Sequence, residues 1–244
     1  MQLRWLEQTE EQVPTGNAWL TQGERAHLAA LHMPKRRADW RLGRWTAKCA
    51  VATCFEKPCS LVELEIRAAE SGAPEVFRRH AAAPFTISIS HRNNAACCAV
   101  AERSVEVGCD LEWIEPRSRA FIDDYFTRSE QHLVLNTALA DQPLLVALLW
   151  SAKESALKAL RVGLRADTRS VEVEIPEFSS EPWEHPDSWR PIVVRHSGGK
   201  YYGWWRYSER LVRTVVAAPR QPPPVPVPFE GSSIYSEIFG SDNL

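Results

Sequence analysis

The feature that most constrains the fold of this chain is a pair of helix motifs that occurs twice. Trp45-Thr46-Ala47-Lys48 returns as Trp150-Ser151-Ala152-Lys153, 105 positions later. Thr21-Gln22-Gly23-Glu24 returns as Thr127-Arg128-Ser129-Glu130, 106 positions later. Each threonine has a glutamate three residues on, which is the capping-box pattern at the start of a helix. Short helical segments can match by chance, but two matches at nearly one offset indicate an internal duplication.

The hydrophobic pattern predicts a similar order of elements in both halves. We expect helices at residues 21–32, 35–55, 119–126, 129–137 and 144–160. We expect strands at residues 3–6, 61–68, 85–90, 95–101, 105–112, 171–175, 191–195, 201–207 and 211–217. Because the strands do not alternate regularly with the helices, the predicted fold class is α+β. The predicted domains are residues 1–103 and 104–218, followed by a proline-rich tail at 219–244.

The tail is set apart by its prolines, which cannot enter a helix or the interior of a sheet. We therefore expect residues 219–244 to be extended and disordered. Two alternatives remain open: a ligand for a proline-recognising domain, or docking through apolar residues near the end of the tail. Those residues are Ile234, Tyr235, Ile238 and Phe239.

Composition excludes several classes of protein. With 29 Lys and Arg against 31 Asp and Glu, the net charge is −2, which argues against a general nucleic-acid binder. No segment approaches the roughly 20 apolar residues of a membrane span, and the first residues lack the apolar core of a signal peptide. The six cysteines show no C-x-x-C spacing, so we expect reduced thiols in a cytoplasmic protein rather than a zinc site or disulfides.

Two carboxylates stand close together in Gly108-Cys109-Asp110-Leu111-Glu112. Side chains alternate along a strand, so Asp110 and Glu112 share one face while Leu111 points to the other. Such a pair suits a hard cation of the magnesium type. Taken alone, the pattern is more often solvated surface. Here Val105 and Val107 precede it in a run that should be partly buried, where uncompensated carboxylates would be costly.

A third carboxylate lies on the long helix that follows. Glu154 and Lys158 are four residues apart and so share a helix face. Read alone, they form an ordinary surface ion pair. The almost wholly apolar run at 144–150 instead suggests that the charged turn faces a cleft. Together with Asp110 and Glu112, this helix predicts a site for a magnesium-bound polyphosphate, and hence phosphoryl-transfer chemistry.

Positive charge gathers in the first half of the chain. The residues Arg37, Arg41, Arg44 and Lys48 form one stripe along the second helix, and Lys35 and Arg36 extend it. Such stripes are usually solvated faces. In a chain of net charge −2, a basic run with Asp39 as almost its only acidic neighbour is also a candidate for phosphate binding. Ser90-His91-Arg92, at the end of a strand, would supply further groups able to grip a phosphate.

In this order, the segments 85–91, 108–112 and 150–158 resemble the 4′-phosphopantetheinyl transferases of the long, two-half type. The resemblance covers residues from about 20 to about 175. It implies a pseudo-dimer of two similar α+β halves with the active cleft between them. It also implies transfer of the phosphopantetheine arm of coenzyme A to a serine of an acyl or peptidyl carrier protein, with release of adenosine 3′,5′-bisphosphate.

The resemblance also assigns roles to individual residues. It implies that Asp110, Glu112 and Glu154 hold magnesium, that Glu154 helps to deprotonate the incoming serine, and that Lys158 neutralises charge on the phosphate. It implies that coenzyme A is bound by Lys35, Arg44, Ser90, His91, Lys153 and Lys158, with His91 at the 3′-phosphate. Because Cys49 stands where the second half has Glu154, we expect one metal site per chain.

The sequence departs from the family pattern at one turn. Many relatives carry a lysine between glycine and proline, where this chain has Gly72-Ala73-Pro74, so that one phosphate contact is either lost or supplied by Arg78 or Arg79. Two other functions remain open: a metal-dependent nuclease, and a module that binds coenzyme A or a carrier protein without turnover.

The expected partner is a carrier protein that is acidic around its serine, and the chain is expected to act as a monomer. Candidate docking residues are Trp113, Ile114 and the helix at 121–126. The sequence leaves open whether the pathway makes fatty acids, polyketides or nonribosomal peptides. No nucleic acid and no membrane are expected as partners.

Overall fold

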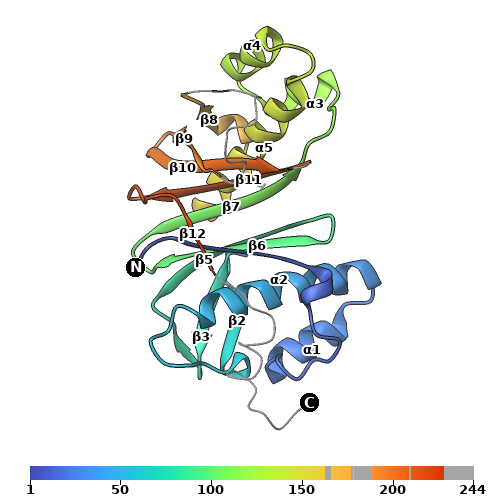
Figure 1. Cartoon of the computed structure of the whole chain (residues 1–244), viewed down its shortest axis with the longest axis vertical. Coiled ribbons are helices and arrows are strands. Elements are labelled where there is room, and N and C mark those ends of the chain that lie inside the picture. The colour runs from blue at the N-terminus through green and yellow to red at the C-terminus, as the bar shows by residue number, and fades with distance from the viewer. Residues whose placement is uncertain (163–165, 177, 179–187, 209, 228–244) are drawn as a thin grey trace. The chain divides into compact units, whose positions relative to one another are not determined.

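The computed structural model describes residues 1–162, 166–176, 178, 188–208 and 210–227 (Figure 1). The chain forms two compact units, one of Met1–Ser104 with Val225–Leu244 and one of Val105–Pro224. Both contain helices and sheets, which confirms the α+β class. The pseudo-dimer layout, and an active cleft between the halves, stay predictions.

The N-terminal unit is built around a four-stranded sheet and a long helix. The sheet has the order β12-β1-β6-β5 and a separate three-stranded sheet has the order β2-β3-β4. Helix α2 packs on β1, β5 and β6 (Figure 1). The helices are α1 (Gln22–Ala30) and α2 (Pro34–Ala52), with 3-10 turns at Glu10–Gln12 and Leu61–Glu63. The strands are β1 (Arg4–Thr9), β2 (Leu64–Ala68), β3 (Pro74–Arg78), β4 (Ala81–Ala82), β5 (Phe85–Arg92), β6 (Ala95–Glu102) and β12 (Val225–Pro226).

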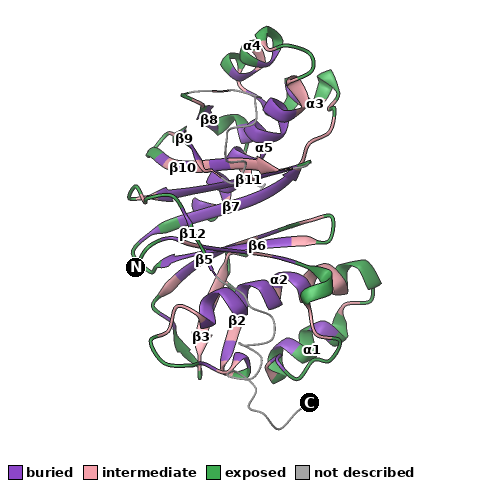
Figure 2. Cartoon of the chain, in the orientation of Figure 1, coloured by how far each residue is buried: buried purple, intermediate pink, exposed green. Residues whose placement is uncertain are grey.

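The C-terminal unit has one antiparallel sheet of five strands in the order β7-β11-β10-β9-β8. Helix α5 packs on β7 and β11, and Figure 2 shows most of these three elements in the colour of buried residues. The helices are α3 (Arg119–Tyr125), α4 (Arg128–Asn136) and α5 (Gln142–Ala159), with a 3-10 turn at Thr168–Ser170. The strands are β7 (Glu106–Trp113), β8 (Val171–Glu174), β9 (Arg190–His196), β10 (Gly199–Ser208) and β11 (Leu211–Ala218).

A buried glutamate joins three elements of the N-terminal unit. Glu24, at the third position of α1, accepts a hydrogen bond from the backbone N–H of its capping residue Thr21 at 3.0 Å. It accepts another from the N–H of Ile66 in β2 at 3.2 Å. Lys48 of α2 forms an ion pair with the same carboxylate and donates to the carbonyl oxygen of Trp19 at 3.0 Å. The charge of Glu24 is thus fully compensated, as a buried carboxylate requires.

The C-terminal unit repeats this arrangement. Glu130, at the third position of α4, accepts from the N–H of its capping residue Thr127 at 2.8 Å and from the N–H of Val173 in β8 at 2.9 Å. Lys153 of α5 forms the ion pair, at 2.8 Å. Burial lowers the pKa of Lys153, as it does that of Lys48 in the other unit. Both predicted capping boxes are confirmed, and the glutamate and lysine of the repeated motifs form the same ion pair in each unit.

The prediction that the whole tail is disordered was wrong for its first residues. Val225 and Pro226 form β12, which pairs in parallel with β1. The N–H groups of Val225 and Val227 donate to the carbonyl oxygens of Leu3 and Trp5, at 2.9 and 2.8 Å. Pro226 lies between these two donors, where no N–H is required, so a proline is tolerated on this edge strand. The suggested docking of residues 234–239 falls outside the described residues.

Candidate functional site

The C-terminal unit has a point of unusually close contact where α5 crosses β7. A Cβ atom on Gly108 would lie 1.8 Å from the carbonyl oxygen of Ser155 and 2.7 Å from the backbone nitrogen of Ala159. Only glycine therefore allows the two backbones to approach so closely. Since Asp110 follows Gly108 on the same face of β7, the contact places its carboxylate beside the last turns of α5.

Asp110 is held by the helix that crosses it. The ammonium group of Lys158 donates to Asp110 Oδ1 at 2.7 Å and to the carbonyl oxygen of Cys109 at 3.0 Å. Only 3% of Asp110 is exposed. Burial disfavours the charged form of Lys158, but the charges around it, Asp110 foremost and Glu154 among them, outweigh that effect and raise its pKa. The structure thus brings together Asp110, Glu154 and Lys158, and keeps the lysine cationic.

Glu112, the second carboxylate of β7, has a different partner. It is buried, and its Oε1 accepts a hydrogen bond from Arg117 at 2.8 Å. Arg117 also pairs with Glu115 at 3.0 Å and lies over the ring of Phe121 at 5.2 Å. Sequence reasoning did not single out Arg117. The only signal was its position five residues after Glu112, in the loop that leaves the strand.

The predicted metal ligands fit a hard cation by chemistry. Asp110 and Glu112 are buried on one face of β7, and Glu154 lies on the helix packed against that face, so the donors are all carboxylate oxygens. Within the described residues, no three His, Cys, Asp or Glu side chains are grouped so that they could hold a metal ion. As the side chains stand, Asp110 pairs with Lys158 and Glu112 with Arg117. A bound cation would compete with Lys158 and Arg117 for these carboxylates.

One predicted ligand of coenzyme A has to be withdrawn. Lys153 is completely buried, and its ammonium group meets Glu130 at 2.8 Å and the carbonyl oxygens of Thr168 and Val171 at 2.9 and 2.6 Å. These acceptors use all three of its N–H donors. Lys153 therefore holds α5 to α4 and β8, and has no donor left for a phosphate.

Most of the basic stripe on α2 also serves the fold. Arg37 donates to the carbonyl oxygens of Leu28 and Leu31, at 2.6 and 3.1 Å, at the end of α1. Arg41 donates to carbonyl oxygens of the loop at residues 14–16. Lys48 forms its ion pair with the buried Glu24. Three of the four basic residues of the stripe therefore bind other parts of the unit.

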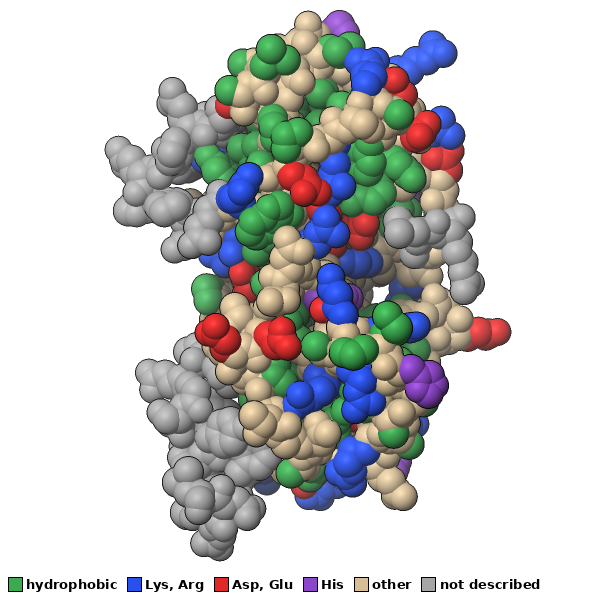
Figure 3. All heavy atoms as spheres, turned by 90° about the vertical axis from the view of Figure 1, so that its right-hand side faces the viewer, with side chains coloured by type: hydrophobic (Ala, Val, Ile, Leu, Met, Phe, Trp, Pro, Cys, Tyr) green, Lys and Arg blue, Asp and Glu red, His purple; other side chains and the backbone are tan. Residues whose placement is uncertain are grey.

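Arg44 and Lys35 differ from the rest of the stripe. The guanidinium of Arg44 stacks on the ring of Trp40 at 5.1 Å, and burial lowers its pKa. Its Nε is buried and has no hydrogen-bond partner within the described part of the chain. Lys35 is exposed in the first turn of α2. Figure 3 shows Lys and Arg side chains gathered on the face of this unit where α1 and the start of α2 lie. The side chains of Arg44 and Lys35 are both suited to bind an anion.

The residues at the end of β5 that are predicted to bind phosphate lie close to α2. His91 is exposed, and its Nε2 is 3.9 Å from Oδ2 of Asp39 on α2, a pair that is charged only when the histidine is protonated. Ser90, the preceding residue, is buried within β5. Within the N-terminal unit the structure therefore places His91 next to the helix that carries Arg44 and Lys35.

The family model of the 4′-phosphopantetheinyl transferase superfamily matches residues 106–210. This segment belongs to that superfamily. The match runs from the first residue of β7 to the loop before β11, and it includes Asp110, Glu112, Glu154 and Lys158. The resemblance seen in the sequence is confirmed at the level of the superfamily, and membership supports phosphopantetheine transfer in general. The long, two-half type stays a prediction. No curated protein matches the chain.

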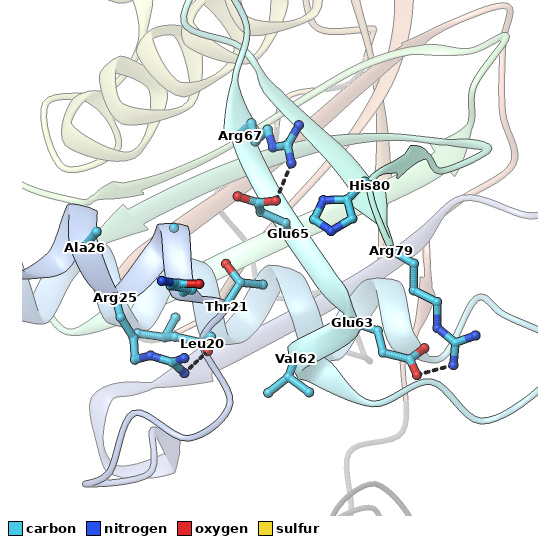
Figure 4. A pocket seen from close by; sticks show the side chains of 12 residues that line it. Leu20, Thr21, Arg25, Ala26, Val62, Glu63, Glu65, Arg67, Arg79 and His80 are labelled. Atoms are coloured by element: carbon cyan, nitrogen blue, oxygen red, sulfur yellow. Dashed lines mark hydrogen bonds and ion pairs between the residues drawn. The ribbon is translucent and has the colours of Figure 1, made fainter.

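The turn that departs from the pattern of the phosphopantetheinyl transferases lies in the hairpin of β2 and β3, where Gly72 has a φ of +87°. Arg78 and Arg79, proposed as substitutes for the missing lysine, both pair with Glu63, at 3.2 and 2.5 Å. Figure 4 shows the second of these pairs at the border of a surface cavity of about 830 Å³. Apart from Arg79, no residue predicted to bind coenzyme A or magnesium lines that cavity.

Two expectations of cellular context can be compared with the structure. All six cysteines are thiols, as expected for a reducing compartment. None of the described helices is both long and apolar enough to cross a membrane. The expected cytoplasmic location and monomeric state stay predictions.

Proposed function

We propose that this protein transfers the 4′-phosphopantetheine moiety of coenzyme A to a serine of an acyl or peptidyl carrier protein, in a magnesium-dependent reaction that releases adenosine 3′,5′-bisphosphate. The observation that carries the proposal is the contact of Lys158 with buried Asp110 beside Glu154, within the segment that belongs to the superfamily. Carboxylates and a fixed cation beside one another are the groups that attack on a pyrophosphate requires.

Lys158 is proposed to stabilise the charge that develops on the phosphate under attack. Its raised pKa keeps the ammonium protonated throughout the neutral range. Its side chain is 28% exposed, so the lysine is not fully enclosed by the protein. Because the lysine is already fixed by Asp110 and the carbonyl of Cys109, little reorganisation is needed when charge develops.

Glu154 is proposed to accept the proton of the incoming serine, directly or through a water molecule. It is half-buried one helical turn before Lys158, so the base and the cation share one face of α5. Asp110, Glu112 and Glu154 would hold magnesium, which when bound would polarise the pyrophosphate oxygens. Lys153 has no part in this proposal.

Coenzyme A itself is proposed to contact Lys35, Arg44, Ser90 and His91, with His91 at the 3′-phosphate. The support is local to the N-terminal unit. Arg44 has a buried Nε that lacks an acceptor within the described residues, and His91 lies beside the same helix. A phosphate oxygen would satisfy such a donor.

The test is mass spectrometry of apo acyl and peptidyl carrier proteins incubated with this protein, coenzyme A and magnesium. We expect the carrier to gain the mass of one phosphopantetheine, and to gain none when EDTA is added or when the Asp110→Ala variant is used. Arg195→Ala is a matched control, because Arg195 is exposed on β9 and pairs with the exposed Glu174 of β8 at 3.0 Å. Absence of a mass gain with every carrier, while coenzyme A still binds, would favour the binding module without turnover. Absence of coenzyme A binding would contradict the proposal altogether.

A further inference from the structure

We propose that three buried hydroxyl groups, those of Ser151 and Ser155 on α5 and Thr214 on β11, position Glu154 and Lys158 against Asp110. The consequence for catalysis rests on the proposed function. None of the three hydroxyls is proposed to contact the substrate. They are positioning residues: they fix α5, and α5 carries Glu154 and Lys158.

The three hydroxyls form one hydrogen-bonded cluster with Thr214 at its centre. Thr214 Oγ1 lies 2.8 Å from Ser151 Oγ and 2.7 Å from Ser155 Oγ, and Ser155 Oγ lies 3.4 Å from the carbonyl oxygen of Thr214. All three residues are completely buried. Each hydroxyl has one proton, so donation can run from Ser151 to Thr214, then to Ser155, and finally to the carbonyl oxygen of Thr214. Every hydroxyl proton then has an acceptor. These bonds favour one position of α5 along β11.

The register of the sheet connects this cluster to the site. Thr214 lies directly opposite Asp110 in the pairing of β11 with β7. Ser151 and Ser155 are four residues apart on α5, and so are Glu154 and Lys158, which makes the two pairs neighbouring rows on the helix surface. The serine row contacts β11, and Lys158 contacts β7.

A second contact fixes the same turns of α5 from the side of β7. The backbone of Ser155 lies against Gly108, two residues before Asp110. The hydroxyl cluster on β11 and the glycine contact on β7 therefore constrain α5 on both sides of the carboxylate. A shift of the helix along either strand would carry Lys158 away from Asp110.

The other half of the chain shows that packing a helix on a sheet does not require such a cluster. At the positions of Ser151 and Ser155, α2 has Thr46 and Ala50. Alanine has no hydroxyl, and the buried hydroxyl of Thr46 has no hydrogen-bond partner within the described residues. The half that lacks the cluster is also the half with a cysteine in place of Glu154. The cluster therefore occurs together with the catalytic pair, and not with the shared scaffold.

The test compares three variants of the full chain. Thr214→Val keeps the shape of the side chain but leaves both serines without their shared partner, and Thr214→Ser restores the hydroxyl. Thr168→Val is the matched control, because Thr168 is a buried threonine of the same unit whose hydroxyl donates to the carbonyl oxygen of Tyr125 at 2.9 Å. For each variant, kcat and KM for coenzyme A are measured together with the unfolding free energy.

A second readout does not depend on activity. In protein labelled with [15N]lysine, the ammonium signal of Lys158 is assigned by its loss in Lys158→Arg. Its chemical shift and hydrogen exchange report the contact with Asp110. We expect Thr214→Val to move this signal towards those of exposed lysines, and we expect Thr168→Val to leave it unchanged.

We expect Thr214→Val to lower kcat by about 10- to 100-fold, as loss of supporting hydrogen bonds in active sites does, with KM changed by less than about twofold. Thr214→Ser should recover most of kcat, and Thr168→Val should lose stability without loss of kcat. The positioning role is overturned if Thr214→Val keeps the kcat and the lysine signal of the wild type, or if Thr168→Val changes both to the same degree. If the wild type transfers nothing, the proposed function fails, and the lysine signal alone decides the positioning role.

Discussion

Glu24 and Glu130, which lie 106 residues apart in the sequence, make the same three contacts in their respective units. Each accepts from the N–H of its helix-capping threonine, from the N–H of a residue in the following strand, and from a completely buried lysine. Each carboxylate is thus surrounded by hydrogen-bond donors inside the protein. It also joins a short helix, a long helix and a sheet at one point.

The ion pairs can be tested by removing one partner or both. We expect Lys153→Met to destabilise the protein by about 3–5 kcal/mol, because it leaves Glu130 charged and uncompensated in the interior. Lys153→Met combined with Glu130→Gln should recover a large part of that loss. Urea unfolding measures both, and Lys48→Met in the N-terminal unit is the parallel variant. A loss below about 1 kcal/mol for the single substitution would contradict this account.

Gly108 should not tolerate any side chain. We expect Gly108→Ala to cost about 3 kcal/mol or more of unfolding free energy, because the new Cβ would overlap the backbone of α5. Gly16→Ala is the control, since no atom lies within 4 Å of a Cβ added there. Thermal unfolding of the two variants provides the comparison. Equal melting temperatures would show that α5 can move away from β7 without cost.

The contribution of Lys158 to stability should depend on pH in a defined direction. Its folded-state pKa is raised above the ordinary 10.5, so as pH increases the unfolded chain loses this proton first. The stabilisation is therefore fully present below about pH 10.5 and is lost as the pH rises through the folded-state pKa. We expect the difference in unfolding free energy between wild type and Lys158→Met to be constant from pH 7 to about pH 9.5 and smaller at about pH 11.5. A decline already below pH 9 would argue against a raised pKa of Lys158.

Arg44 should contribute directly to the binding of coenzyme A. We expect Arg44→Gln to weaken binding by about 10- to 100-fold, because a charge-assisted hydrogen bond to phosphate contributes about 1.5–3 kcal/mol. Arg44→Lys keeps the charge but loses the planar donors. Its affinity for coenzyme A should lie between that of the wild type and that of Arg44→Gln. Isothermal titration calorimetry without magnesium isolates this step from turnover. Unchanged affinity in Arg44→Gln would remove Arg44 from the proposed site, and Lys57→Gln serves as the surface control.

Patterns with strong local rules were predictable from the sequence. The capping boxes at Thr21 and Thr127 follow from spacing alone, and both are present. The placing of Asp110 beside Glu154 and Lys158 was expected from the resemblance to the phosphopantetheinyl transferases, because periodicity shows only which residues share a face of one element. What brings the two elements into contact is Gly108, whose role depends on how α5 crosses β7 and could not be read from the order of residues.

Predictions failed where a charged side chain binds a carbonyl group far away in sequence. Periodicity placed Arg37 and Arg41 on one face of a helix, but it could not show that carbonyl oxygens of the preceding loop and helix lie next to that face. Lys153 was assigned to the ligand because it belongs to the motif at 150–158 that carries the resemblance, but its own side chain is completely buried. Arg117 was missed since its contact with Glu112 depends on the path of an irregular loop.

The pairing of β12 with β1 has a consequence for the synthesis of this chain. The four-stranded sheet uses residues near the start of the sequence and residues 225–226, which are made more than two hundred residues later. The C-terminal unit, residues 105–224, lies entirely between them. On the ribosome, the later unit can therefore complete its own sheet before the earlier one receives its last strand. Until then, the hydrogen-bonding edge of β1 that β12 will cover stays open to other extended chains.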